Sequence, residues 1–295
     1  MHRALLILTA TIVSLNAGFL AAQEATATKR DVSEDFVRIS KTDSDQPKGL
    51  DTAIVRFEGK PSTKYAGQVV DLVGVVHIGQ EDYYSKLKQR LSEYDVVLYE
   101  LVAPDGTRIR PEDLQQRRSL LASMQTGMKD MLNLEYQLEK IDYMAKNFRH
   151  ADMSPDEFAK DMERRGDSLP KMIARMMGAS LAAQSKNAGS ELDLLRAMFS
   201  DDRAMLMKRA MATQLSDIGV ATAGMDDVNG DNTLIKGRNA KAFEVLEEEL
   251  KAGKKTVAVF YGAGHLDDMA DRLRDDFDML PKKTTWLQAW DLQSN

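Results

Sequence analysis

The sequence predicts an α/β fold: a mixed, largely parallel central sheet flanked by helices, with a long helical insertion between the two halves of the sheet. Two observations lead to this prediction. Apolar runs of strand length alternate with helical segments at 68–100 and again at 239–290. Between these regions, at about 111–215, the pattern is helical only, which divides the strands into two groups along the chain.

The first group of strands starts at 52–57 and is followed by a loop that contains glycine and proline. The run 68–77 is apolar, has the length of a strand and ends in a histidine. A helix is expected over about 80–94, and the apolar run 95–100 ends in a carboxylate. Strand, helix and strand within about thirty residues form a βαβ unit, so these two strands should be parallel.

The insertion carries two clear helix signals. Apolar residues recur at steps of three, four and seven from Leu121 to Phe148, which predicts a long helix with one apolar face. Ser154, Pro155 and Glu157 form a capping box with proline at the first helical position, which predicts the start of another helix.

The second group of elements follows the insertion. A helix is expected over 239–250, and the strand 256–261 leads directly into a glycine-rich turn that ends in a histidine. Another helix should begin near Asp267, and 284–290 can form the last strand.

The N-terminus has the layout of a secretory signal peptide. A short positive start precedes an apolar run, and small residues stand before a predicted cleavage site near Ala22. An uncleaved membrane anchor is the competing interpretation, which Asn16 and the small residues disfavour. Residues 23–50 are polar and predict a flexible leader with one short strand near 36–39, before the domain at 51–295. We therefore expect a secreted or periplasmic protein that is free of the membrane after cleavage.

Composition narrows the partners and the chemistry. The formal net charge of −6 argues against nucleic acid or anionic lipid as the main partner. The chain has no cysteine, which excludes a disulfide framework and a lipid anchor attached to cysteine at the cleavage site. The sequence leaves the oligomeric state open.

Each of three apolar runs ends in a residue that can act as an acid, a base or a metal ligand, namely His77, Glu100 and His265. In an α/β sheet, ligands bind beyond the carboxyl ends of the strands. Two imidazoles and one carboxylate are a frequent ligand set for Zn²⁺, Mn²⁺ or Fe²⁺. Without a metal, one histidine can act as general base while Glu100 orients it. The sequence therefore predicts an active site formed by these three side chains, with either chemistry.

Each of the two histidines closes the pattern GxxH, which begins at Gly74 and at Gly262. A glycine there allows a ligand or a neighbouring strand to approach closely. Arg238 precedes a helix start and is a candidate to hold a carboxylate or an oxyanion, although a plain surface arginine fits the spacing equally well. His150 lies before the capped helix and is predicted to be structural.

These motifs resemble those of the TraB/GumN family, which includes the Tiki proteases, and more distantly the erythromycin esterases and the haem-binding protein ChaN. The resemblance rests on GVVH at 74–77, VVLYEL at 96–101, GRN at 237–239 and VFYGAGHLDDMADRL at 259–273. It covers roughly 68–290 and implies an active-site set of His77, His265 and Glu100, with Arg238 and Asn239 in support. Nothing here shows the membrane tether of the Tiki branch, so the substrate of that branch is not carried over.

The leading hypothesis is an exported metal-dependent hydrolase that acts on a peptide or a small acyl substrate. His77, His265 and Glu100 would hold a divalent ion (Mn²⁺, Zn²⁺, Co²⁺ or Fe²⁺), and Arg238 would stabilise developing negative charge. The alternative is a protein that binds a metal or haem through the same histidines without turnover.

Overall fold

A computed structural model gives the fold. It describes residues 35–104, 107, 132, 134–168, 170, 171, 174, 175, 202–216 and 231–293, which all belong to one compact unit, Glu34–Asn295. The predicted signal peptide at 1–22, the first part of the leader and much of the predicted insertion lie outside the described residues.

The centre of the molecule is a seven-stranded sheet, counted over the described residues. Along the chain its strands are β1 (Val37–Lys41), β2 (Pro47–Gly59), β3 (Val69–Val75), β5 (Val96–Tyr99), β7 (Phe148–His150), β8 (Thr256–Gly262) and β9 (Met279–Asp291).

The sheet is mixed, and its pairing divides it into two parts. The strands β3, β8, β5 and β7 lie side by side in this order and are all parallel. The long strand β2 runs antiparallel to β3 and to β1, which share one of its edges, while β9 pairs antiparallel along the other edge. The predicted α/β fold with a mixed, largely parallel sheet is therefore confirmed. The two strands of the predicted βαβ unit, β3 and β5, are parallel as expected, but β8 lies between them.

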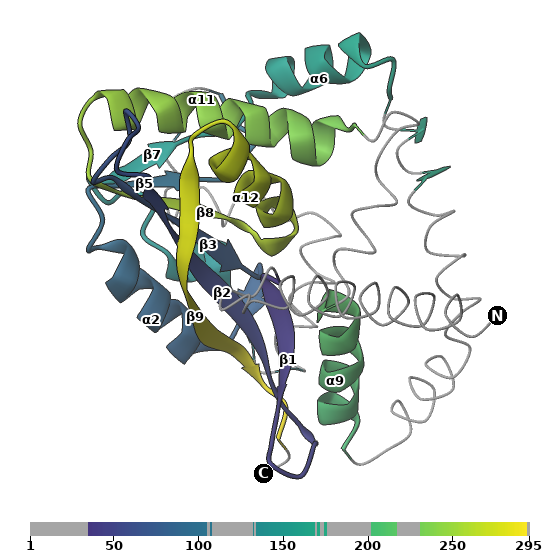
Figure 1. Cartoon of the computed structure of the whole chain (residues 1–295). Coiled ribbons are helices and arrows are strands. Elements are labelled where there is room, and N and C mark those ends of the chain that lie inside the picture. The colour runs from purple at the N-terminus through teal and green to yellow at the C-terminus, as the bar shows by residue number, and fades with distance from the viewer. Residues whose placement is uncertain are drawn as a thin grey trace, which may run out of the picture. The chain divides into compact units, whose positions relative to one another are not determined.

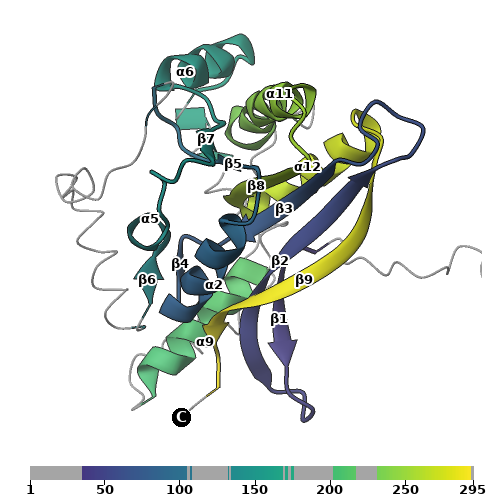
Figure 2. The same cartoon turned by 90° about the vertical axis from the view of Figure 1, so that its left-hand side faces the viewer.

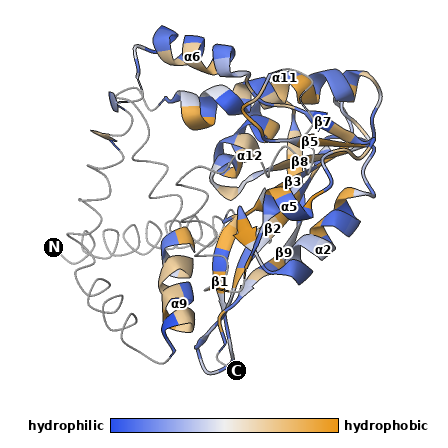
Figure 3. Ribbon diagram, turned by 180° about the vertical axis from the view of Figure 1, so that it is seen from behind, coloured by the Kyte–Doolittle hydropathy of each residue, from blue (hydrophilic) through white to orange (hydrophobic). Residues whose placement is uncertain are grey.

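Helices cover both faces of this sheet. The helix α2 (Glu81–Leu91) lies on one face, and α11 (Arg238–Lys251) and α12 (Leu266–Asp275) lie on the other (Figures 1 and 2). Right-handed crossovers explain the two faces, because the chain moves from β3 to β5 through α2 and returns towards β8 through α11. Apolar residues gather on the strands, whereas α6 (Pro155–Arg164) is mostly polar (Figure 3).

Smaller elements complete the described chain. The two-residue strands β4 (Ile78–Gly79) and β6 (Glu135–Tyr136) pair with each other, and α5 (Gln137–Lys140) follows β6 directly. The helix α6 begins with the predicted capping box of Ser154 and Glu157. The remaining helical segments are α9 (Arg203–Ser216), the π-helix η1 (Thr233–Gly237) and the 3₁₀ turn η2 (Ala263–His265). None of the helices within the described residues is both long and apolar enough to span a bilayer.

Two predictions need correction. The long helix expected to end at Phe148 is wrong over residues 134–150, where β6, α5, a turn and β7 follow one another. Leu134, Ile141 and Phe148 are buried as the apolar pattern requires, but Leu134 precedes β6, Ile141 follows α5 and Phe148 begins β7. The boundary placed at residue 50 also falls inside a strand, because β2 begins at Pro47, and β1 occupies the place of the expected short strand.

Candidate active site

The residues of the site lie just beyond the carboxyl ends of the four parallel strands. His77 follows β3, Glu100 follows β5 directly, and His265 follows β8 at the end of η2. The fourth strand, β7, is followed by Asp152. Parallel strands end at the same edge of a sheet, which explains how residues from distant parts of the chain meet.

The three predicted residues converge on Gly262. A methyl group placed on its Cα would lie 3.2 Å from Oε2 of Glu100, 3.8 Å from Nε2 of His77 and 3.9 Å from Cδ2 of His265. Nε2 of His265 is 3.6 Å from Oε1 of Glu100. The structure thus brings His77, Glu100 and His265 together, and it shows why a glycine stands at position 262.

Glu100 is held as a carboxylate. Its Oε2 accepts a hydrogen bond of 2.7 Å from the backbone N–H of Gly262, and its Oε1 accepts one of 2.8 Å from Arg238. Burial alone would raise the pKa of Glu100. Electrostatic interactions with His265 and Arg238 outweigh burial and lower this pKa to about 2.

Arg238 links Glu100 to a second, fully buried carboxylate. Its Nε and one terminal nitrogen donate to the two oxygens of Asp152 at 3.0 and 2.5 Å. The other terminal nitrogen lies 3.5 Å from Nε2 of His265. Arg238 is the first residue of α11 and follows η1 directly, and π-helical turns are frequent at functional sites. The arginine is therefore a buried part of the site and not a plain surface residue.

His265 is held in one tautomer by Asn239. The side-chain nitrogen of Asn239 donates to His265 O and to Asp268 Oδ2, both at 2.9 Å, and both atoms can only accept. Its oxygen must therefore face Nδ1 of His265, 2.7 Å away, so that Nδ1 carries the proton and Nε2 presents a lone pair. Burial lowers the pKa of His265 and outweighs the opposing effect of Glu100, which favours the neutral ring.

His77 is the exposed member of the site. Its Nδ1 lies 2.9 Å from Oε1 of Gln137, and the backbone N–H of Gln137 donates to His77 O. Exposure therefore rises from His265, which is buried, through Glu100 to His77. The site is closed at its His265 end and open to solvent at its His77 end.

The glycines of the two GxxH patterns have different surroundings. Gly262 faces the site, whereas a methyl group on Gly74 would meet Leu266 Cδ1 at 3.0 Å and Ala53 O at 3.2 Å. Gly74 therefore supports the site indirectly, by letting β2 and the start of α12 pack closely against β3. His150 lies in β7, where its Nε2 is 2.6 Å from Leu101 O, a contact that fits the predicted structural role.

Sequence reasoning missed two partners of the site. The anchoring of Arg238 by Asp152 was not predicted. Gln137 was placed inside the long helix and was given no role. Asp152 lies two residues after β7, and a strand of three residues is too short to show the alternation that would have marked this position.

The donor set fits a divalent ion in its chemistry and charge. With neutral histidines, Glu100 and Asp152 against Arg238 leave a net charge of −1, which accommodates a cation. His77 and His265 supply nitrogen donors and Glu100 supplies oxygen, as Zn²⁺ and related ions require. Within the described part of the chain, no three such side chains already stand in the arrangement of a metal site.

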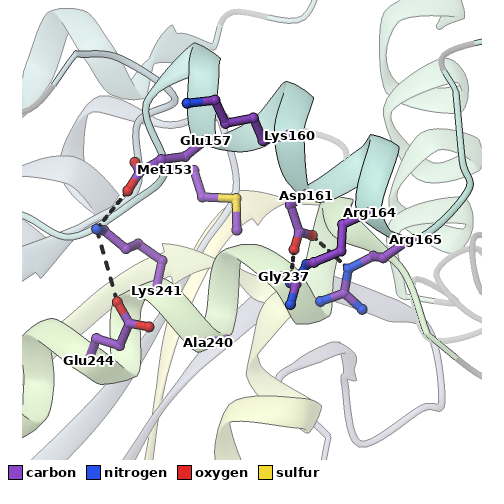
Figure 4. A pocket seen from close by; sticks show the side chains of 10 residues that line it. All are labelled: Met153, Glu157, Lys160, Asp161, Arg164, Arg165, Gly237, Ala240, Lys241 and Glu244. Carbon is purple, nitrogen blue, oxygen red and sulfur yellow. Dashed lines mark hydrogen bonds and ion pairs between the residues drawn. The ribbon is translucent and has the colours of Figure 1, made fainter.

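A hollow of about 300 Å³ lies between α6 and α11, and Met153, Gly237 and Lys241 are among the residues that line it (Figure 4). Its charged side chains largely neutralise one another. Lys241 pairs with Glu157 and Glu244, and Arg165 pairs with Asp161. The Lys241–Glu157 ion pair joins α11 to α6 across this hollow.

Comparisons with known proteins add no assignment: no family model, no curated protein and no solved structure matches the chain.

Proposed function

We propose that this protein is an exported hydrolase that cleaves a peptide or another acyl bond at the site formed by His77, Glu100 and His265. The observation that carries the proposal is the convergence of these three side chains on Gly262, at the shared end of the parallel strands. The resemblance to the TraB/GumN family points to the same residues.

In this proposal His77, His265 and Glu100 hold a divalent metal ion. Such an ion would act as a Lewis acid towards the scissile carbonyl and towards the attacking water. Nε2 of His265 presents its lone pair to the site because Asn239 fixes the proton on Nδ1. Arg238 stands beside Glu100 with its charge held by Asp152, and it can stabilise the negative charge that develops on the carbonyl oxygen.

A second candidate is hydrolysis without a metal, in which a histidine acts as general base. One observation favours it: the guanidinium of Arg238 contacts both the carboxylate of Glu100 and Nε2 of His265, where its positive charge opposes a second cation. Here Nε2 of His265 takes the proton from water, and Glu100 stabilises the resulting imidazolium.

Metal content separates the two candidates. The full chain is purified, and its metal content, absorption spectrum and hydrolysis of an activated ester and of a peptide library are measured. In the metal-dependent mechanism, His77→Ala and His265→Ala remain folded but lose the metal and hydrolysis, while His150→Ala keeps both. Retained hydrolysis after chelation would support the metal-free mechanism. A Soret band without any hydrolysis would instead indicate a haem-binding protein and overturn the proposed function.

Export itself is tested by mass spectrometry of the secreted or periplasmic form. We expect its N-terminus near residue 23, since the predicted cleavage site lies near Ala22. Recovery of intact Met1 in the membrane fraction would instead support the uncleaved anchor.

A further inference from the structure

His77 differs from His265 in being exposed, and an exposed imidazole without a partner exchanges between both tautomers and several rotamers. Any chemistry that needs its Nε2 lone pair therefore needs a second residue to hold the ring. For His265 this role falls to Asn239, which the resemblance to the TraB/GumN family implies as a supporting residue. For His77 the structure offers a residue from a segment sixty positions further along the chain.

We propose that Gln137 is a positioning residue for His77: it accepts the proton of Nδ1 and thereby directs the Nε2 lone pair towards Glu100. The role of Gln137 as a positioning residue rests on the proposed function, whereas the hydrogen bond between Gln137 and His77 does not. The contact that carries the proposal joins Nδ1 of His77 to Oε1 of Gln137 over 2.9 Å.

The backbone holds the two residues in register. The N–H of Gln137 donates to His77 O over 3.0 Å, and the next residue, Ile78, pairs antiparallel with Tyr136. Figure 2 shows β6 and α5 alongside β4. Because both the main chain and the side chain of Gln137 contact the same histidine, the imidazole is fixed relative to its own backbone.

Tyr143 orients the amide of Gln137. The side-chain nitrogen of Gln137 donates to the Tyr143 hydroxyl over 2.9 Å, which leaves the amide oxygen for His77. The Tyr143 ring is buried and packs edge-on against Tyr99, with 5.1 Å between the ring centroids. Tyr99 is the last residue of β5, so the parallel sheet that carries Glu100 also anchors the holder of His77.

Placement of the protons provides a test that needs no substrate. Long-range ¹H–¹⁵N correlation spectra of the ¹⁵N-labelled full chain at about pH 8 distinguish the two neutral tautomers of each imidazole. We expect His77 and His265 to carry the proton on Nδ1. His150 should carry it on Nε2, because its partner is the Leu101 carbonyl, and it serves as the internal control. A proton on Nε2 of His77 in the unaltered protein would overturn the proposal.

Variants connect the tautomer with function. In Gln137→Met the new side chain has nearly the same volume as glutamine but lacks the amide oxygen that accepts the proton of Nδ1. The imidazole of His77 should then become a mixture of tautomers, while those of His265 and His150 stay unchanged. The value of kcat/KM should fall about 10- to 100-fold. Gln137→Glu restores an acceptor and should restore the single tautomer, even where the Met variant folds poorly. Leu138→Ala, at the exposed neighbour on α5, should change neither. An unchanged His77 spectrum in Gln137→Met overturns the proposal. Absence of hydrolysis in every form, with the expected tautomers, counts against the proposed function alone.

Discussion

The two GxxH glycines should fail in different ways when each is replaced by alanine, because their surroundings differ. In Gly262→Ala the new methyl group would lie 3.2 Å from Oε2 of Glu100, closer than carbon and oxygen normally pack. Glu100 must then move by a few tenths of an ångström. Since a displacement of about 1 Å can cost roughly a hundredfold in rate, we expect about a tenfold loss of hydrolysis. The free energy of unfolding should change by less than about 1 kcal/mol, because Gly262 has a φ of −51° that alanine adopts without strain.

In Gly74→Ala the methyl group meets Ala53 O at 3.2 Å, and a backbone carbonyl inside the sheet has no room to move. Overpacking of this kind costs about 1–3 kcal/mol, which urea unfolding followed by circular dichroism measures directly. The fraction of Gly74→Ala that remains folded should hydrolyse an activated ester at nearly the rate of the unaltered protein. Full activity in Gly262→Ala would refute the view that the reaction takes place around this glycine. An unchanged unfolding midpoint in Gly74→Ala would refute the packing argument.

Two further predictions concern the supports of the site. Asp152→Ala leaves Arg238 buried with Glu100 as its remaining carboxylate partner. The free energy of unfolding should therefore fall by about 3 kcal/mol. A loss below about 1 kcal/mol in urea unfolding would contradict this prediction. Hydrogen bonds from Lys241 and Ser154 lower the pKa of Glu157 from 4.5 to about 2, so its charge stabilises the fold above pH 4.5 and this contribution disappears as the pH falls towards 2. The free energy of unfolding of Glu157→Gln should therefore be lower at neutral pH by at most about 1 kcal/mol, since the side chain is partly exposed. This difference from the unaltered protein should disappear in acid. A difference that persists near pH 2 would show that the capping hydrogen bonds of Glu157, and not its charge, are responsible.

The central residues of the site were predictable because their signals are local. His77, Glu100 and His265 each follow an apolar run of strand length, and the convergence of parallel strand ends is a general property of α/β sheets. The fold class followed from the same runs. What the sequence did not predict is the order of the strands, since nothing in the local pattern places β8 between β3 and β5.

The roles of Gln137 and Asp152 could not be predicted from the sequence, for a physical reason. Leu134, Ile141 and Phe148 are spaced by seven residues, as on one face of a helix, yet no helix joins them: Leu134 precedes β6, Ile141 follows α5 and Phe148 begins β7. Strands of two or three residues cannot display alternation, so β6 and β7 remained hidden. With them, the roles of Gln137 and Asp152 remained hidden as well.

The two histidines are held by scaffolds of different strength. His265 is buried at the start of α12, and its holder Asn239 is fully buried and fixed by two acceptors. His77 is exposed, and its holder belongs to a two-residue strand pair and a four-residue helix. The site therefore combines a buried half, formed by His265, Asn239 and Arg238, with an exposed end at His77. Since His77 is the exposed member, we expect substrate to reach Glu100 past His77, while the buried half keeps the Nε2 lone pair of His265 and the charge of Arg238 in place.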